Sequence, residues 1–374
     1  MRRRLFLVGA AATALVGTLA TTTAHADTRP VQPPATALVL PAPSGQHPVG
    51  RAIVHLKDEN RADPWVPAEK REMMVSLWYP AVRPSDTPAP YMTAEESRQY
   101  GAGTGLNVPA DLFAKVRTHS TVDAKPSRVR GGLPLVVLSP GFGMPRATLT
   151  GLAEELASRG YAVAGIGHNY EADGISFPDG RTTSCLACVN RNYPRVGAVR
   201  AEDISFVLDE LTGARPAWKH GAPLDPDRVA VVGHSAGGFS AVPAMLRDPR
   251  VKAAVNMDGN FHFPNDIPLD RPFLMLGKAG HVPGSERSWD ETWTELTGWK
   301  RWLSVDDTDH LTFTDLAALG KQAGMPLQRL DGDRADTITR TYVTAFVDAH
   351  LRGCGTRLLD GPTAGFPEVR FHRP

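Results

Sequence analysis

A serine lies in a short glycine-flanked motif of the kind that carries reactive nucleophiles. The sequence GHSAG at positions 233–237 follows an apolar, β-branched run at 228–232 and opens a helical pattern at 238–247. Between a strand and a helix, a GxSxG turn strains the serine and exposes its hydroxyl, and glycine avoids clashes at the flanking positions. We therefore predict that Ser235 is a nucleophile; a structural serine in a tight turn is the alternative. Pro243 should kink the helix that follows.

A serine hydroxyl needs a base, which is usually a histidine oriented by a carboxylate, and in this kind of site the chain order is serine, acid, histidine. His310 follows the last apolar run at 301–305 and precedes a helix near Thr312. We predict that His310 is the base, with His281 as the second candidate. The acidic run at 306–309 is explained by a loop before His310, and a calcium site is the less favoured interpretation.

The acid is the hardest residue to choose. In the commonest arrangement it follows the next-to-last strand, here 272–276, but the next carboxylates after that run are Glu286 and Asp290. Asp258 instead follows the run at 251–256, one strand after the nucleophile, and should lie at the same edge of the sheet as Ser235. We favour Asp258, and a turn aspartate before glycine is the alternative.

A loop rich in glycine can supply the oxyanion hole. The sequence SPGFGM at 139–144 follows the apolar run 133–138, and its glycines allow the backbone to approach a ligand. We expect the backbone N–H groups of Phe142 and Ala236 to bind the oxyanion. Without the serine motif, an ordinary Pro-Gly turn would be the preferred interpretation.

Short apolar runs separated by helical patterns must position these residues. Early strands are expected at 51–56 and 73–79, and from 133 onward apolar runs at 133–138, 161–166, 228–232, 251–256, 272–276 and 301–305 alternate with helices or long loops. Runs that are apolar on both faces are typical of a parallel sheet buried between helices. Helices are expected at 149–159, 199–211 and 335–351, and the stretch 81–132 is interpreted as an insertion with one or two helices, for example near 109–116. The pattern predicts one α/β domain.

The N-terminus resembles an export signal. Arg2, Arg3 and Arg4 precede an apolar run to about Leu19, and AHA at 24–26 matches a cleavage site. The run is shorter than the ~18 residues of a membrane anchor. We predict a signal peptide at 1–26, by the general or the twin-arginine route, a flexible segment at 27–48, the domain at 49–374, and a secreted protein.

Composition excludes some classes of function and selects none. The formal net charge of +1 gives no basic face for nucleic acid. The chain has three cysteines, so at most one disulfide forms within it, and we expect a local bridge between Cys185 and Cys188 with Cys354 left over. A single CxxC motif without a second cysteine pair does not supply the four ligands of a structural zinc site. We expect no metal and no organic cofactor.

These motifs together resemble the type II platelet-activating factor acetylhydrolases and related bacterial lipases and esterases of the α/β-hydrolase fold. The resemblance runs from about 50 to 353, through REMMVSLWYP at 71–80, SPGFG at 139–143, Arg200 and Asp203, GHSAGG at 233–238, Met257-Asp258 and HLTFTD at 310–315. The resemblance implies a mostly parallel sheet flanked by helices, and Asp258 as the acid. It also implies calcium-independent hydrolysis of esters with short acyl groups. The prolyl-glycyl oxyanion loop departs from the histidyl-glycyl loop of the animal enzymes and is similar to actinobacterial lipases and polyesterases.

We therefore expect a serine esterase that acts on a small-molecule or lipid ester through Ser235, Asp258 and His310. A cutinase-like polyesterase is the alternative within this class. A cofactor-free haloperoxidase or amidase with the same three residues, and a non-catalytic secreted binding protein, are the alternatives outside it. Contact with a membrane surface and the oligomeric state stay open.

Overall fold

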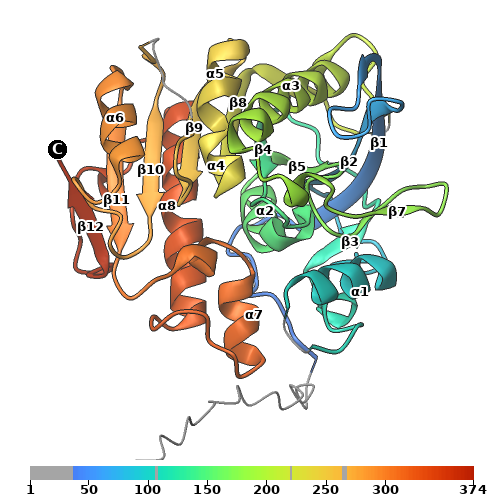
Figure 1. The fold of residues 1–374 in the computed structure, drawn as a ribbon, viewed down its shortest axis with the longest axis horizontal. Helices are drawn as coiled ribbons and strands as arrows, with labels where there is room; N and C mark the ends of the chain where they lie inside the picture. The colour runs from blue at the N-terminus through green and yellow to red at the C-terminus, as the bar shows by residue number, and fades with distance from the viewer. Residues whose placement is uncertain (1–36, 106–107, 220, 263–267) are drawn as a thin grey trace, which may run out of the picture.

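A computed structural model describes residues 37–105, 108–219, 221–262 and 268–374. The expected signal peptide and residues 27–36 lie outside the described residues. Within the described ranges, the apolar runs form one ten-stranded sheet with the order β12-β11-β10-β9-β8-β4-β5-β2-β1-β3 (Figure 1). The strands β4, β5, β8, β9, β10 and β11 are mutually parallel, whereas β2 and β12 run antiparallel to their neighbours. The mostly parallel sheet of the α/β-hydrolase fold is therefore confirmed.

The predicted apolar runs all form strands, with bounds that differ from the prediction by one to six residues at one or both ends. Their bounds are β1 Val49–Ala62, β2 Lys70–Pro80, β3 Ser120–Val122, β4 Leu133–Ser139, β5 Ala162–His168, β8 Leu224–His234, β9 Val251–Met257, β10 Phe273–Gly277, β11 Lys300–Val305 and β12 Val369–His372, with a small separate hairpin of β6 Ile175–Ser176 and β7 Thr182–Thr183.

Helices cover both faces of the sheet, as Figure 1 shows. Alternate strand residues point to opposite faces, so Val137 and Val231 pack with the α3, α4 and α5 side, whereas Val136 and Val232 pack with α2 and α8. Burial on both faces explains why these strands read as continuous apolar runs. The helices are α1 Ala94–Gly103, α2 Thr150–Ser158, α3 Tyr193–Thr212, α4 Ala236–Phe239, α5 Ala241–Arg247, α6 Arg287–Glu295, α7 Leu316–Gln322 and α8 Gly332–Arg352, with short 3-10 turns η1 Phe113–Lys115, η2 Arg146–Leu149, η3 Ala187–Val189, η4 His310–Phe313 and η5 Arg357–Leu359.

The helical pattern after Ser235 forms two helices rather than one kinked helix. The helix α4 ends before Ser240, whose hydroxyl donates to the Ala236 carbonyl, and α5 begins at Ala241. Pro243 has no N–H and its ring would clash with the carbonyl of the residue four positions earlier, Phe239. The helix is interrupted at Ser240, between Phe239 and Pro243, and the interruption avoids this clash.

The described part of the segment 27–48, which the sequence suggested is flexible, packs against the rest of the domain. Leu38 and Leu40 are buried, and the Leu40 amide donates to the carbonyl of Arg117. These leucines pack with Tyr100 of α1, with Phe113 of η1 and with other apolar side chains of the insertion. The proline-rich composition suggested a free tail, but alternate leucines on an extended chain supply enough apolar surface to hold it in place.

Several elements were not placed by the sequence, among them β12 and α1. The strand β12 closes one edge of the sheet, pairing antiparallel with β11 over 369–372. The helix α1 begins at 94, where a capping box joins Thr93 and Glu96, whereas the sequence suggested a helix near 109–116 and the structure has the short turn η1 there. In the described part of the chain, no helix is both long and apolar enough to span a membrane.

Candidate active site

The turn after β8 holds Ser235 in a strained backbone conformation, with φ 53° and ψ −116°. The flanking glycines make this turn sterically feasible. A Cβ at Gly237 would lie 1.9 Å from the Ser139 carbonyl oxygen, and one at Gly233 would lie 2.1 Å from the Gly237 carbonyl carbon. Such strain at a half-buried serine that borders a cavity is typical of a nucleophile elbow. The local structure therefore agrees with the prediction for the motif.

Three predicted residues from distant parts of the sequence meet at the carboxyl ends of the parallel strands. The Ser235 hydroxyl Oγ lies 2.9 Å from Nε2 of His310, and Nδ1 of the same imidazole donates to Asp258 Oδ2 at 2.6 Å. Ser235 follows β8, Asp258 follows β9 and His310 opens η4 after β11. A neutral imidazole bound in this way can accept the serine proton.

The Asp258 carboxylate is buried and contacts two imidazoles. Its Oδ1 lies 2.6 Å from Nδ1 of His281 and accepts the Lys278 amide at 2.8 Å. Burial alone would raise the pKa of Asp258, but contacts with His281 and His310 outweigh it and lower the pKa to about 2. The carboxylate therefore stays ionised at neutral pH. His281, the second candidate for the base, contacts the acid, whereas His310 contacts the serine.

His234, the second residue of the GHSAG motif, contacts the backbone of His310. Burial, with a smaller contribution from nearby His310, lowers the pKa of His234 to about 3, so this imidazole is neutral at pH 7. Its Nε2 donates to the His310 carbonyl at 2.7 Å. The bond ties the backbone of the histidine loop to the turn that carries Ser235, and thereby restricts the position of the His310 ring.

The predicted oxyanion residues border the same cavity as Ser235. Phe142 lies on the loop after β4, and Ala236 is the first residue of α4. Both line a cavity of about 530 Å³ together with Ser235, Asp258 and His310. The structure thus brings all five predicted residues to one concave site.

A buried ion pair holds the oxyanion loop at both ends. Arg200 donates to the carbonyl of Pro140 and, at 2.8 Å, to Oε2 of Glu171. The backbone carbonyl of Glu171 accepts the Gly143 amide at 2.8 Å. Because the pair fixes the residues before and after Phe142, it sets the direction of the Phe142 amide. Both charged side chains are essentially inaccessible to solvent.

A second buried group extends this support to the sheet. Arg71 of β2 donates to Asp203 of α3, and His168 of β5 links the same carboxylate to the Ser139 hydroxyl through contacts of 2.8 and 3.0 Å. Burial alone would raise the pKa of Asp203, but Arg71 and His168 hold it well below its ordinary value. The motif residues Arg71, Arg200 and Asp203 therefore form the base of the oxyanion loop.

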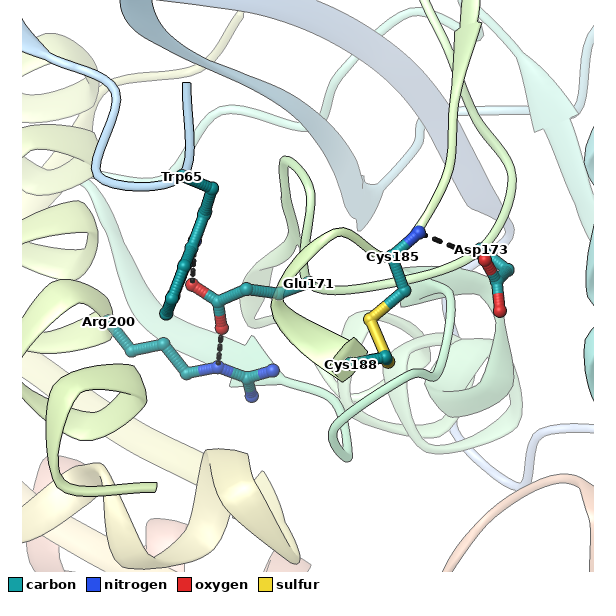
Figure 2. Close-up of a disulfide and its surroundings, with 6 residues drawn as sticks. All are labelled: Trp65, Glu171, Asp173, Cys185, Cys188 and Arg200. Atoms are coloured by element: carbon teal, nitrogen blue, oxygen red, sulfur yellow. Dashed lines mark hydrogen bonds and ion pairs between the residues drawn. A yellow bond between two sulfur atoms is a disulfide. The ribbon is translucent and has the colours of Figure 1, made fainter. Parts of the chain in front are cut away.

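A disulfide closes the loop that lies over this support. Cys185 and Cys188 are joined, with their Cα atoms 5.3 Å apart, and Asp173 accepts the Cys185 amide at 2.9 Å. Figure 2 shows this bridge beside Glu171, which lies between Trp65 and Arg200 and accepts a hydrogen bond from each. Cys354 is a free, exposed thiol. The bridge keeps compact the segment that carries Glu171 toward α3.

Aromatic rings form one wall of the cavity. Tyr193 stacks on His262 with ring centroids 4.8 Å apart and 16° between the planes, and it makes an edge contact with Phe142 at 5.6 Å. Phe239 makes a further edge contact with His262. These rings place aromatic surface in the same cavity as Ser235 and His310.

The less favoured acids have structural roles of their own. Glu286 caps α6 by accepting the Ser288 amide, and Asp290 accepts the Gly284 amide. In the acidic run before His310, Asp306 pairs with Arg370 and Asp309 accepts the His310 amide. Among the described residues, no group of three or more His, Cys, Asp or Glu side chains is placed to hold a metal ion.

Sequence reasoning missed three features of this site. It did not find the Glu171–Arg200 support, the aromatic wall, or the contact of His281 with the acid. The sequence analysis noted Arg200 as part of the family resemblance, but it did not predict that Arg200 bonds to Glu171 and Pro140. The spacing of Glu171, Tyr193 and His262 in the sequence does not predict their place in the site. Each lies in a loop or at a helix end, whose position depends on tertiary packing.

The fold is that of the α/β-hydrolase class, and the site brings together a serine, a histidine and an aspartate in the arrangement that a serine hydrolase uses. The model for platelet-activating factor acetylhydrolase, isoform II, matches residues 35–178. A probable 1-alkyl-2-acetylglycerophosphocholine esterase of Arthroderma benhamiae is 27% identical over 371 residues, covering 89% of this chain and 93% of that protein. Platelet-activating factor acetylhydrolase of Cavia porcellus is 22% identical, over 58% of this chain and 57% of that protein.

A solved structure extends the likeness along the chain. The ferulic acid esterase from Streptomyces cinnamoneus is 42% identical, with a TM-score of 0.79, and the match covers 90% of this chain and 100% of that one. The chain belongs to the same family of esterases as this ferulic acid esterase, and part of it matches the platelet-activating factor acetylhydrolase isoform II model. It is a carboxylic ester hydrolase.

Proposed function

We propose that the enzyme cleaves esters through an acyl-enzyme on Ser235. The Ser235 oxygen attacks the ester carbonyl while its proton moves to Nε2 of His310, and the Phe142 and Ala236 amides bind the oxyanion. The carbon–oxygen bond to the alcohol then breaks, and the alcohol leaves with the proton from His310. Water, deprotonated by His310, attacks the acyl group, the carboxylic acid leaves, and Ser235 regains its proton.

One observation carries this proposal: the continuous hydrogen-bonded series from Ser235 through His310 to Asp258, with contacts of 2.9 and 2.6 Å. Asp258 stabilises the imidazolium that forms during attack, because its low pKa keeps it charged. The strained serine turn and the supported oxyanion loop meet at the same cavity.

For the substrate, we propose short-chain acyl esters or lipid esters, together with secretion before the enzyme meets them. The names of the Arthroderma and Cavia relatives both refer to acetyl-ester hydrolysis of a lipid, which supports this choice. The arginine-led apolar N-terminus and its AHA site support export.

An aromatic acyl ester is the second candidate substrate. The wall formed by Tyr193, His262 and Phe239 favours it, because a planar ring gains from edge and stacked contacts with other rings. The ferulic acid esterase shares 42% of its residues with this chain, which adds weight.

The test compares Ser235→Ala with Ser240→Ala, a nearby serine whose hydroxyl donates to a backbone carbonyl. Purified proteins are assayed on p-nitrophenyl acetate, methyl ferulate, a 2-acetyl phospholipid, a polyester film and p-nitroacetanilide. We expect Ser235→Ala to lose about 10⁵-fold or more in kcat on every ester cleaved, with Ser240→Ala within about tenfold of wild type. Retained turnover in Ser235→Ala would contradict the proposal. Faster cleavage of the anilide than of any ester would favour an amidase.

A further inference from the structure

A second cavity opens beside the catalytic one and plays no part in the mechanism above. It has a volume of about 580 Å³, within the ~300–1,000 Å³ range of pockets that hold small molecules. It lies between α1, η1 and α7, and the first and last of these are adjacent at the lower end of the molecule in Figure 1. Its wall includes Tyr100, Phe113, Met144, Leu316, Leu319 and Leu327.

This apolar cavity adjoins the catalytic cavity. Phe142, Cys188 and Arg191 border both spaces. Two further wall residues are covalent neighbours of the reacting groups, because Leu311 follows His310 and Gly143 follows Phe142. One end of the apolar cavity therefore lies next to the space around Ser235 and His310.

The walls of the two cavities differ in chemistry. Around Ser235, polar side chains such as Asn260, Lys278 and His281 face the space. In the apolar cavity, the polar groups of Asp173 and Thr104 are already bonded to the Cys185 amide and the Gly101 carbonyl. What this cavity offers a ligand is mainly aliphatic and aromatic surface, and transfer of methylene groups from water to such surface is favourable.

We infer that the apolar cavity binds a hydrocarbon chain of the ester substrate while its carbonyl lies at Ser235. The inference rests on the proposed function and deepens it, because it assigns a chain-binding site to particular residues. The chain can belong to the acyl group or to the alcohol, and the chemistry of recognition is the same. Each buried methylene should contribute roughly a factor of four to kcat/KM.

The experiment fills the cavity and measures chain-length preference. Ala323 borders the cavity at the end of α7, so Ala323→Phe adds a ring to the space. Ala198→Phe is the matched control, because Ala198 is an exposed residue of α3. The acyl arm compares p-nitrophenyl octanoate with p-nitrophenyl acetate, and the alcohol arm compares octyl acetate with ethyl acetate.

We expect Ala323→Phe to lower one of the two kcat/KM ratios, octanoate to acetate or octyl to ethyl, by at least tenfold. The arm that changes identifies the chain, and Ala198→Phe should leave both ratios within twofold of wild type. If Ala323→Phe does not fold, Leu316→Asn makes the same test by adding a polar group to the wall. If acetate is hydrolysed and neither ratio changes, the inference is overturned while the proposed function stands.

A binding measurement separates the inference from catalysis. Ser235→Ala protein is titrated calorimetrically with 1-octanol, with and without Ala323→Phe. We expect the added ring to weaken binding at least tenfold. Equal binding in the two proteins, or none in either, overturns the inference. Wild-type protein that cleaves no ester, with octanol binding still weakened by Ala323→Phe, would contradict the proposed function and leave the apolar site in place.

Discussion

The catalytic cavity and the apolar cavity meet at Phe142 but are built from different parts of the chain. The proposed catalytic residues follow β8, β9 and β11, which are parallel strands buried at their carboxyl ends. The apolar cavity is formed by the segment around Leu38, the insertion with α1 and η1, and α7. In this molecule, the sheet determines which bond is attacked, and the segments outside the sheet shape the space available to the rest of the substrate.

This difference has a physical origin. Strand ends in a packed sheet hold side chains rigidly, which catalysis at distances near 3 Å requires. Segments outside the sheet tolerate changes in length and composition, because fewer buried groups depend on them. Substitutions at the strand ends should therefore lower the rate on all esters alike, whereas substitutions in the apolar cavity should change preference among esters.

The largest effect should come from the acid and the base. Asp258→Asn should lower kcat about 10⁴-fold, because an amide cannot hold the imidazole in the required tautomer or stabilise its positive charge. The measurement is kcat on p-nitrophenyl acetate and p-nitrophenyl octanoate. We expect the same fold loss on both, and a loss confined to one chain length would break the proposed division between the cavities.

A smaller effect should follow from loosening the oxyanion loop. Arg200→Lys keeps a positive charge but loses the forked contacts with Glu171 and Pro140, so kcat should fall about ten- to a hundredfold with little change in KM. Arg195→Lys on the same helix is the control, because Arg195 is exposed. The affinity for an alkyl boronic acid, which mimics the tetrahedral state, should fall with kcat. A fall in melting temperature with unchanged kcat would assign Arg200 a structural role alone.

The smallest effect concerns pH and stability. The pKa of Asp258 in the folded protein is about 2, below its ordinary value of 3.8, so its charge stabilises the fold above about pH 4. This contribution is lost as the pH falls through 2. Between about pH 5 and pH 2, wild type should therefore lose about 2 kcal/mol more of its free energy of unfolding than Asp258→Asn. Urea denaturation of both proteins measures it, and parallel losses would show that the carboxylate is not held in its charged form.

The sequence predicted the sheet, and it singled out three residues that the structure brings together, for the same physical reason. Strands buried on both faces must be apolar throughout, so 133–138, 228–232 and 251–256 were recognisable as strands, and the residues that follow them must lie at one edge. Ser235, Asp258 and His310 were found because each follows such a run. The family resemblance added weight to Asp258, which spacing alone left open against Glu286 and Asp290.

The rest of the site depends on contacts that have no local pattern. The Glu171–Arg200 pair joins a loop to a helix, and His281 reaches Asp258 from the loop after β10. The order of residues 37–48 depends on Leu38 and Leu40 fitting against the insertion, and a proline-rich composition does not reveal such a fit. Tertiary packing of this kind determines the shape of both cavities.

The most direct test of the central claim is covalent labelling of the wild-type protein with a fluorophosphonate, followed by mass spectrometry of the intact chain and its peptides. We expect one adduct per chain, on the peptide that contains Ser235, and labelling at least a thousandfold slower in His310→Gln. An unlabelled protein, or an adduct on any other residue, would contradict the account of Ser235 as a nucleophile activated by His310.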